Sequence, residues 1–190
     1  MAINSTNLEN DQFGYACYTL VAPAPSELVE SLLDIEKAAE QERAKIPAHV
    51  TVKGTFYDIQ SLDNLLEAIH SVAGAHQPIN LDTAGMETWE LEHSVILGFV
   101  VNHEIQALHD DLMAQIGPLG KSAYLDDPYR PHMSIVNEVK PEGVAIAKQE
   151  IDDIDLGDRL RFGDIDLMGR DGVAWGGVWK RLARFQLGAD

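Results

Sequence analysis

The chain has 190 residues, of which 45% are apolar, and it carries 14 basic against 31 acidic residues, a formal net charge of −17. This length and composition are typical of one globular domain with a sizeable core. The charge excludes a protein that coats DNA or RNA, because such proteins present surfaces rich in Lys and Arg. A small nucleotide, or a single RNA end in a locally positive pocket, is compatible with it.

The start of the chain predicts neither secretion nor membrane insertion. Residues 1–12 are polar and contain neither Lys nor Arg, so we expect a flexible tail there and a single domain over 13–190. The longest strongly apolar run, 95–101, is too short to cross a bilayer. Cys17 is the only cysteine and has no partner for an intrachain disulfide. We therefore expect a cytoplasmic protein that does not associate with membranes.

From residue 15 on, the chain alternates between the period-2 pattern of strands and the 3.6-residue pattern of helices. Ser26, Ser61, Asn102 and Pro141 are typical helix starters, and apolar residues at helical spacing follow each of them. The expected order is a strand at 15–22, a helix at 26–41, a strand at 49–59, a helix at 61–74, a hairpin at 79–89 and 93–101, a helix at 102–116, a loop at 117–129, a strand at 132–139, a helix from 141 and further strands over 160–187.

The order strand, helix, strand, helix occurs twice, over 15–74 and over 93 to about 155. We therefore expect an α+β fold that is bilobal and pseudo-twofold, built from duplicated β-α-β units. Each lobe would hold an antiparallel-rich sheet with outer helices. The two sheets would flank a central groove.

One short phrase occurs once in each half of this duplicated pattern. Residues 49–52 are His-Val-Thr-Val and residues 132–135 are His-Met-Ser-Ile, so both read His, apolar, hydroxyl, apolar. In a strand, residues i and i+2 point to the same side, so each histidine shares a face with a hydroxyl while the apolar residues face the core. Because the phrases stand at equivalent places, we expect both polar faces to line the groove.

These four polar residues suit acid–base chemistry at a phosphodiester. His49 and His132 can each transfer a proton, one from the attacking oxygen and one to the leaving oxygen, because imidazole titrates near neutrality. The hydroxyls of Thr51 and Ser134 are placed to donate to the non-bridging oxygens, where charge develops. The sequence does not say which histidine is the base. Such a site needs no metal and no cofactor.

Five further residues are candidates for contact with a substrate. Continuing the alternation adds Lys53 to the first polar face and Arg130 to the second, where their charges would neutralise a phosphate. Tyr129, Tyr124 and Phe56 offer aromatic rings on which a base can stack.

The other histidines offer no competing site. We expect His109, on the third helix, to face solvent, and His93, near a strand, to have a structural role. None of these histidines stands at a metal-ligand spacing with a carboxylate or cysteine. The loop 117–129 is, by its length and position, our candidate for a lid over the groove.

The doubled phrase, with Pro131 directly before the second histidine, resembles the two His-x-[Ser/Thr]-x signatures of the 2H phosphoesterase superfamily. That group includes 2′-5′ RNA ligase-like proteins and cyclic nucleotide phosphodiesterases. The order of elements agrees over nearly the whole chain, and the run 49–54, His-Val-Thr-Val-Lys-Gly, is most similar to the small bacterial branch. One departure is Ala48, which separates Pro47 from the first histidine.

The resemblance implies a bilobal fold with both phrases lining the groove. It also implies hydrolysis, without a metal, of 2′,3′-cyclic or 2′-5′-linked phosphodiesters of nucleotides or RNA ends, giving a 2′-phosphate. The expected partner is a small nucleotide or an RNA end, and the expected state is a monomer.

Three alternatives stay open. Cyclic oligonucleotide signals and ADP-ribose cyclic phosphate present the same reacting group, so a hydrolase of either would use the same residues. A non-catalytic nucleotide- or RNA-binding module would keep the groove, although binding alone does not require a paired acid and base. A metalloprotein could use His49 and His132 as ligands, and dependence of its activity on a divalent ion would reveal it.

Overall fold

The computed structural model describes residues 10–41, 46–91, 93–122, 128–171 and 178–189. Their order follows the sequence periodicity closely. The elements are β1 (Cys17–Pro23), α1 (Ser26–Ala38), β2 (His49–Tyr57), α2 (Leu62–Ala75), β3 (Ile79–Trp89), β4 (Ser94–Phe99), α3 (His103–Ile116), the 3-10 turn η2 (Gly117–Leu119), β5 (Lys121–Ser122), β6 (His132–Val136), α4 (Pro141–Ile151), β7 (Arg159–Phe162), β8 (Asp164–Asp171) and β9 (Val178–Gln186).

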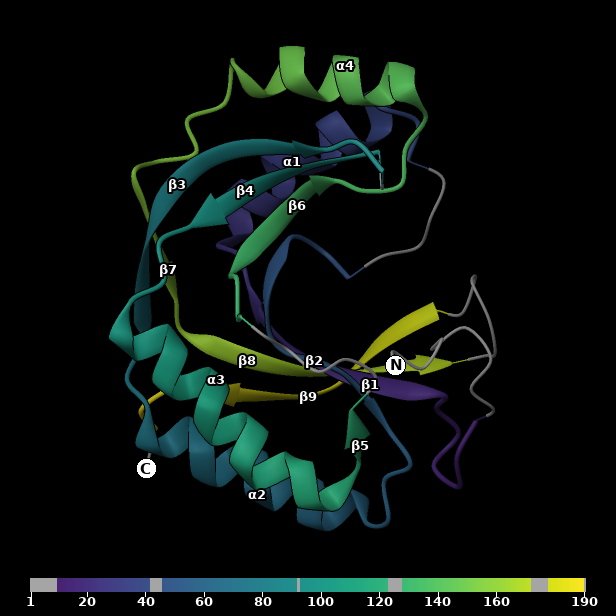
Figure 1. Ribbon diagram of the computed structural model, residues 1–190, viewed down its shortest axis with the longest axis vertical. Coiled ribbons are helices and arrows are strands. Elements are labelled where there is room, and N and C mark those ends of the chain that lie inside the picture. The colour runs from purple at the N-terminus through teal and green to yellow at the C-terminus, as the bar shows by residue number, and fades with distance from the viewer. Residues whose placement is uncertain (1–9, 42–45, 92, 123–127, 172–177, 190) are drawn as a thin grey trace.

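The strands form one curled sheet in the order β7-β3-β4-β6-β2-β1-β8-β9, with β5 paired to β2 at the side. The pairs are all antiparallel. The sequence predicted two separate sheets, and this prediction is corrected by the pairing of β2 with β6, which joins the strands of both halves. The two strands that carry the histidine phrases are therefore neighbours in the middle of the α+β fold (Figure 1).

Helices cover the sheet in two pairs. α1 packs against α4 and β6, whereas α2 packs against α3 and β9. Figure 1 shows the first pair at the top of the view and the second pair at the bottom. Ser61 and Asn102 cap α2 and α3, and each side chain accepts a hydrogen bond from a backbone amide of the first turn. Within the part of the chain that the structure describes, no helix has the length and apolar character needed to cross a lipid bilayer.

Side chains of β2 and β6 alternate between the core and the opposite face of the sheet. The apolar members of both histidine phrases are 0% exposed and belong to the core. The two histidines and the two hydroxyl residues keep part of their surface exposed on the opposite face. This alternation is the one that the sequence predicted, and it fixes where the polar groups lie.

Asp11 belongs to the folded body, although we placed it in the N-terminal tail. Its Oδ2 accepts a hydrogen bond of 2.7 Å from the hydroxyl of Tyr18, and its Oδ1 accepts hydrogen bonds from the amides of Phe13 and Tyr15. Burial and then this carboxylate contact raise the pKa of Tyr18. Residues 1–9 of the predicted tail lie outside the described residues.

Candidate active site

The two histidine phrases lie side by side on β2 and β6. The apolar residues that follow the two histidines are paired with each other in antiparallel register. One residue to either side of this pair, the register sets His49 across from Ser134 and Thr51 across from His132. Directly opposite residues of an antiparallel pair point to the same face of the sheet. We call this arrangement the four-residue site, and in it each histidine has a hydroxyl on its own strand and another across from it.

Both imidazole rings are held in the same way. Nδ1 of His49 lies 2.8 Å from the carbonyl oxygen of Pro47, and Nδ1 of His132 lies 2.9 Å from the carbonyl oxygen of Arg130. A carbonyl oxygen only accepts, so these contacts assign the ring hydrogen to Nδ1 in both cases. Nε2 is then the ring nitrogen that can exchange a proton with a bound group. Ala48 occupies the position that Pro131 has before the second histidine, and the contact with the carbonyl two residues earlier is the same in both strands.

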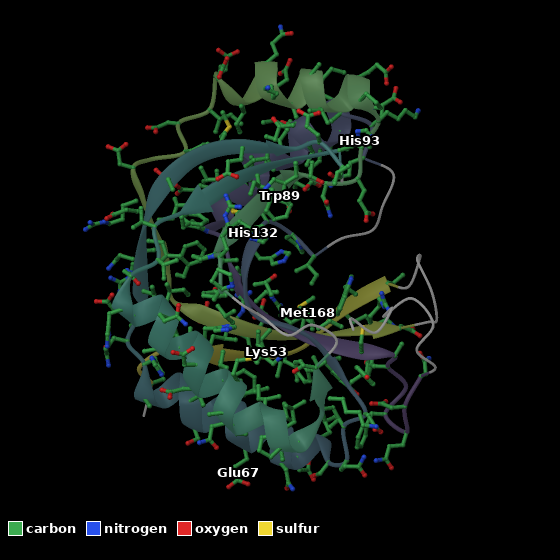
Figure 2. The ribbon with its side chains drawn as sticks, in the orientation of Figure 1. Lys53, Glu67, Trp89, His93, His132 and Met168 are labelled. Carbon is green, nitrogen blue, oxygen red and sulfur yellow. The ribbon has the colours of Figure 1, made fainter. Side chains whose placement is uncertain are left out.

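An aromatic ring from the neighbouring hairpin contacts His132. The ring of Trp89, the last residue of β3, has its centroid 4.7 Å from that of His132, at an interplanar angle of 52°. Figure 2 shows the two side chains next to each other. The sequence analysis did not select Trp89, because alternation within β6 does not show which side chain of a distant strand reaches its histidine, and β4 lies between β3 and β6 in the sheet.

Arg130 is engaged on the same side of the site. Its guanidinium forms an ion pair with both carboxylate oxygens of Glu87 on β3. The side chain is still 58% exposed, so it lies at the surface beside the second histidine phrase. The sequence predicted that Arg130 would neutralise a phosphate. A phosphate bound there would have to compete with the Glu87 carboxylate, which the sequence did not indicate.

The surroundings of His49 are open by comparison. A pocket of about 630 Å³ is lined by His49, by Val21 of β1, by Met168 of β8 and by Trp179 of β9. Figure 2 shows Met168 in the lower half of the view, away from Trp89 and His132. His49 is the one member of the four-residue site in its wall. The pocket wall also contains arginines from β7 and β9, namely Arg161, Arg181 and Arg184.

Comparison with known families matches most of the chain to one of them. The model of the 2′-5′ RNA ligase superfamily covers residues 22–174. The chain belongs to the 2′-5′ RNA ligase superfamily. This confirms the resemblance to the 2H phosphoesterases that the doubled phrase indicated.

Solved structures of similar fold cover nearly the whole chain. TT0787 of Thermus thermophilus is 17% identical with a TM-score of 0.64, over 92% of this chain and 99% of that one. A structure described as a phosphoesterase is 16% identical with a TM-score of 0.63, over 90% and 98%. E. coli LigT in apo form is 16% identical with a TM-score of 0.60, over 90% and 96%. A search of curated proteins finds no match. At these identities the agreement is one of fold.

The alternation that the sequence predicted along β2 stops at Lys53. Between the pairs Val21–Thr51 and Leu20–Lys53, β2 advances by two residues while β1 advances by one. This bulge changes the face that the following residues occupy. Lys53 is 1% exposed, and its Nζ donates to the hydroxyl of Ser122 at 3.0 Å. The structure thus places Lys53 beside β5, in the interior, and not on the exposed polar face that the sequence predicted.

Of the three aromatic residues predicted to contact a substrate, Phe56 is buried and Tyr124 lies outside the described residues. Phe56 is 1% exposed and stacks on Tyr18 in the core, with ring centroids 5.7 Å apart, so it presents no ring face to a ligand. Tyr124 lies outside the described residues, as does the rest of 123–127 within the predicted lid. The beginning of that loop forms η2 and β5.

Tyr129 and His109 hold β2 next to the first histidine phrase. Their rings stack with centroids 4.0 Å apart and an interplanar angle of 7°. The Tyr129 hydroxyl donates to the carbonyl of Thr51 at 3.0 Å, and Nδ1 of His109 lies 2.9 Å from the carbonyl oxygen of Val52. We expected His109 to face solvent, but it is 5% exposed. It lies one turn after the buried Ile105, and this spacing could have placed it inside.

Proposed function

We propose that this member of the 2′-5′ RNA ligase superfamily is a metal-independent phosphodiesterase. It hydrolyses 2′,3′-cyclic or 2′-5′-linked phosphodiesters of nucleotides or RNA ends and releases a 2′-phosphate. The observation that carries the proposal is the four-residue site, with two imidazoles in the same tautomer and a hydroxyl across from each. A paired proton acceptor and donor is what displacement at phosphorus requires, and simple binding does not require it.

For a 2′,3′-cyclic phosphate, the reaction proceeds as follows. A neutral imidazole takes a proton from water through Nε2 while the water oxygen forms a bond to phosphorus. The bond between phosphorus and O3′ breaks, and the second imidazole, which starts protonated, gives its proton to O3′. The products are a 2′-phosphate and a 3′-hydroxyl, and the two imidazoles have exchanged protonation states, which solvent restores.

The hydroxyls of Thr51 and Ser134 stabilise the charge that grows during this step. Negative charge develops on the non-bridging oxygens as the new bond forms, and fixed donors aimed at them lower the barrier. Each hydroxyl lies across the β2–β6 pair from one of the histidines, because of the register around the central apolar pair. This arrangement supports donation from both sides of one phosphate.

Related structures and the charge of the chain both support a short nucleotide substrate. E. coli LigT has been solved in complexes with 3′-AMP and with ATP, at 14% and 16% identity and TM-scores of 0.58 and 0.56 to this chain. A net charge of −17 repels a long phosphate backbone over distance, whereas a small ligand need meet only the local charges of the groove.

The test is hydrolysis of the four 2′,3′-cyclic nucleotides in the presence of EDTA, with the product identified by phosphorus NMR. We expect a 2′-phosphate from the wild type and loss of turnover in both His49→Ala and His132→Ala. His70→Ala, which changes an exposed histidine on α2, is the matched control and should retain full activity.

Two outcomes would overturn the proposal. Activity that EDTA abolishes and a divalent ion restores would replace the two-histidine mechanism with a metal-dependent one. Tight binding of cyclic nucleotides and RNA ends without turnover of any of them would identify a binding module.

A further inference from the structure

The pocket beside His49 is large enough for more than the reacting phosphate. Its volume of about 630 Å³ falls within the range of roughly 300–1,000 Å³ that is usual for small-molecule sites. It adjoins the four-residue site only through His49. A substrate whose phosphodiester lies between the two histidines would therefore place its remaining atoms, on the His49 side, inside this pocket.

Basic side chains gather in this pocket although the chain as a whole is strongly acidic. Arg161, Arg181 and Arg184 line it, out of 14 basic residues in a protein with a net charge of −17. Glu30, Asp164 and Asp166 are the acidic residues in the same pocket wall. Three arginines and three carboxylates thus offset each other in the pocket wall, in contrast to the acidic excess of the whole chain.

A bulge in β9 brings two of these arginines to the same face. Arg184 pairs with Asp166 and Arg181 pairs with Met168, so β9 advances by three residues where β8 advances by two. Simple alternation would put residues three apart on opposite faces. Because of the bulge, both guanidiniums line the pocket together with Trp179, which precedes Arg181 by two residues.

Asp166 holds the two arginines in unequal ways. Its side chain is 7% exposed and accepts hydrogen bonds of 2.7 Å from both Nε and Nη2 of Arg184. Nη1 of Arg181 lies 3.6 Å from the same carboxylate, beyond hydrogen-bond distance, and its side chain is 54% exposed. Arg184 is thus engaged by two hydrogen bonds to Asp166, whereas Arg181 makes none to this carboxylate, so the N–H donors of its guanidinium can reach a ligand.

Trp179 adds an aromatic ring to the pocket wall that also contains Arg181. The ring is partly buried, and the guanidinium of Arg170 lies 5.8 Å from its centroid. An aromatic ring stacks with any nucleobase, and a planar guanidinium matches two oxygens of a phosphate. A ring and a phosphate joined through a sugar are the parts of a nucleotide.

We propose that this pocket binds a second phosphate of the substrate through Arg181, with Arg161 as a further cation and Trp179 against an aromatic base. The favoured substrates would then be cyclic or 2′-5′-linked nucleotides that carry a phosphate besides the one that reacts. This inference rests on the proposed function for the reacting phosphate, but binding of the second phosphate can be measured without turnover.

Three compounds test the proposal. They are adenosine 2′,3′-cyclic phosphate with a 5′-hydroxyl, the same compound with a 5′-phosphate, and the dinucleotide in which a second adenosine esterifies that 5′-phosphate. We expect kcat/KM of the wild type to be about tenfold higher for the two compounds with a second phosphate, the scale of one charge-assisted contact. A higher value for the 5′-phosphate indicates a terminal monoester as the ligand, and a higher value for the dinucleotide indicates a chain.

Variants of three arginines test which side chain causes this preference. Arg181→Gln should reduce the preference from about tenfold to within about twofold, because the charge-assisted contact that causes it is lost, and Arg161→Gln should weaken it. Arg159→Gln is the matched control, because Arg159 is an exposed arginine on β7 that pairs with Asp82 outside the pocket wall, and it should retain the full preference. Equal kcat/KM values of the wild type for all three compounds would overturn the proposal. So would an equal fold-loss for all three in Arg181→Gln.

Binding to the His132→Ala variant, measured by calorimetry with the same three compounds, separates this inference from the proposed function. A preference for the second phosphate that Arg181→Gln abolishes in this background supports the pocket even if the wild type hydrolyses none of them. Turnover without any preference in binding or in kcat/KM supports the phosphodiesterase and overturns the pocket.

Discussion

The two histidines have the same backbone support and different neighbours. Each ring is held by the carbonyl two residues before it, and each faces a hydroxyl across the β2–β6 pair. His132 contacts the ring of Trp89, whereas His49 opens into a pocket bounded by β8 and β9. The comparison teaches that two central strands set the chemistry of the site, and that more distant strands set what each half of it can hold.

The largest expected effect separates the roles of the two histidines. Replacing either by Ala removes general acid or base catalysis, which contributes about 10²–10⁴-fold to a rate. A base must be unprotonated, so its activity falls as pH decreases, and an acid must be protonated, so its activity falls as pH increases. We expect a bell-shaped pH profile of kcat/KM for the wild type.

The residual activity of each variant then assigns the roles. The variant that lacks the base should lose the fall at low pH, and the variant that lacks the acid should lose the fall at high pH. Loss of the same limb in His49→Ala and His132→Ala would contradict a division of labour between the two sides of the site.

The hydroxyls should have the next largest effect. Thr51→Val and Ser134→Ala each remove a donor to the non-bridging oxygens, and loss of one such donor costs about 100-fold in kcat. Because the two hydroxyls are related across the β2–β6 pair, we expect similar losses in both variants. Thr55→Val, farther along β2, is the control and should leave kcat unchanged. A loss confined to KM would show that the hydroxyls bind substrate without stabilising the transition state.

Trp89→Leu should have a smaller effect that is confined to one side. An aromatic contact of this kind is worth about 1 kcal/mol, so we expect kcat to fall by up to about fivefold as His132 loses its fixed orientation. As a positioning residue, Trp89 should shift the limb of the pH profile that belongs to His132 and leave the other in place. Leu91→Ser, at an exposed position just after β3, is the control. A shift of both limbs would point to a general loss of structure.

Tyr129→Phe should have the smallest effect and act on the His49 side. It keeps the ring stacked on His109 and removes the hydroxyl that donates to the carbonyl of Thr51. We expect the free energy of unfolding to fall by about 1 kcal/mol, the usual contribution of one hydrogen bond, as measured by urea unfolding. Tyr57→Phe, at the end of the same strand, is the control. An unchanged stability would mean that the hydroxyl does not brace β2.

The sequence predicted those parts of the fold that depend on local pattern. The period-2 alternation in 49–52 and 132–135 placed both histidines and both hydroxyls on the polar faces of strands, and the caps Ser61 and Asn102 marked the starts of α2 and α3. These features depend on neighbouring residues only, so they can be read without knowing the rest of the fold.

The sequence did not predict features that depend on pairing between distant strands. It indicated two sheets, because nothing local shows that β2 and β6 are hydrogen-bonded to each other. It placed Lys53 on the polar face, because a bulge is visible only in the register against β1. For the same reason it overlooked Trp89 beside His132, and the arginines of β9 that a second bulge brings together.

The backbone contacts of the two imidazoles have a consequence for how such a protein can evolve. Where a carboxylate orients a catalytic histidine, one substitution can remove the orienting group. Here the orienting atoms are carbonyl oxygens, of Pro47 in one strand and Arg130 in the other, and every amino acid supplies one. Substitution of the residues before each histidine therefore leaves in place the carbonyl oxygen that contacts Nδ1. Solved structures at 16–17% identity show how far the sequence can diverge while the fold is kept.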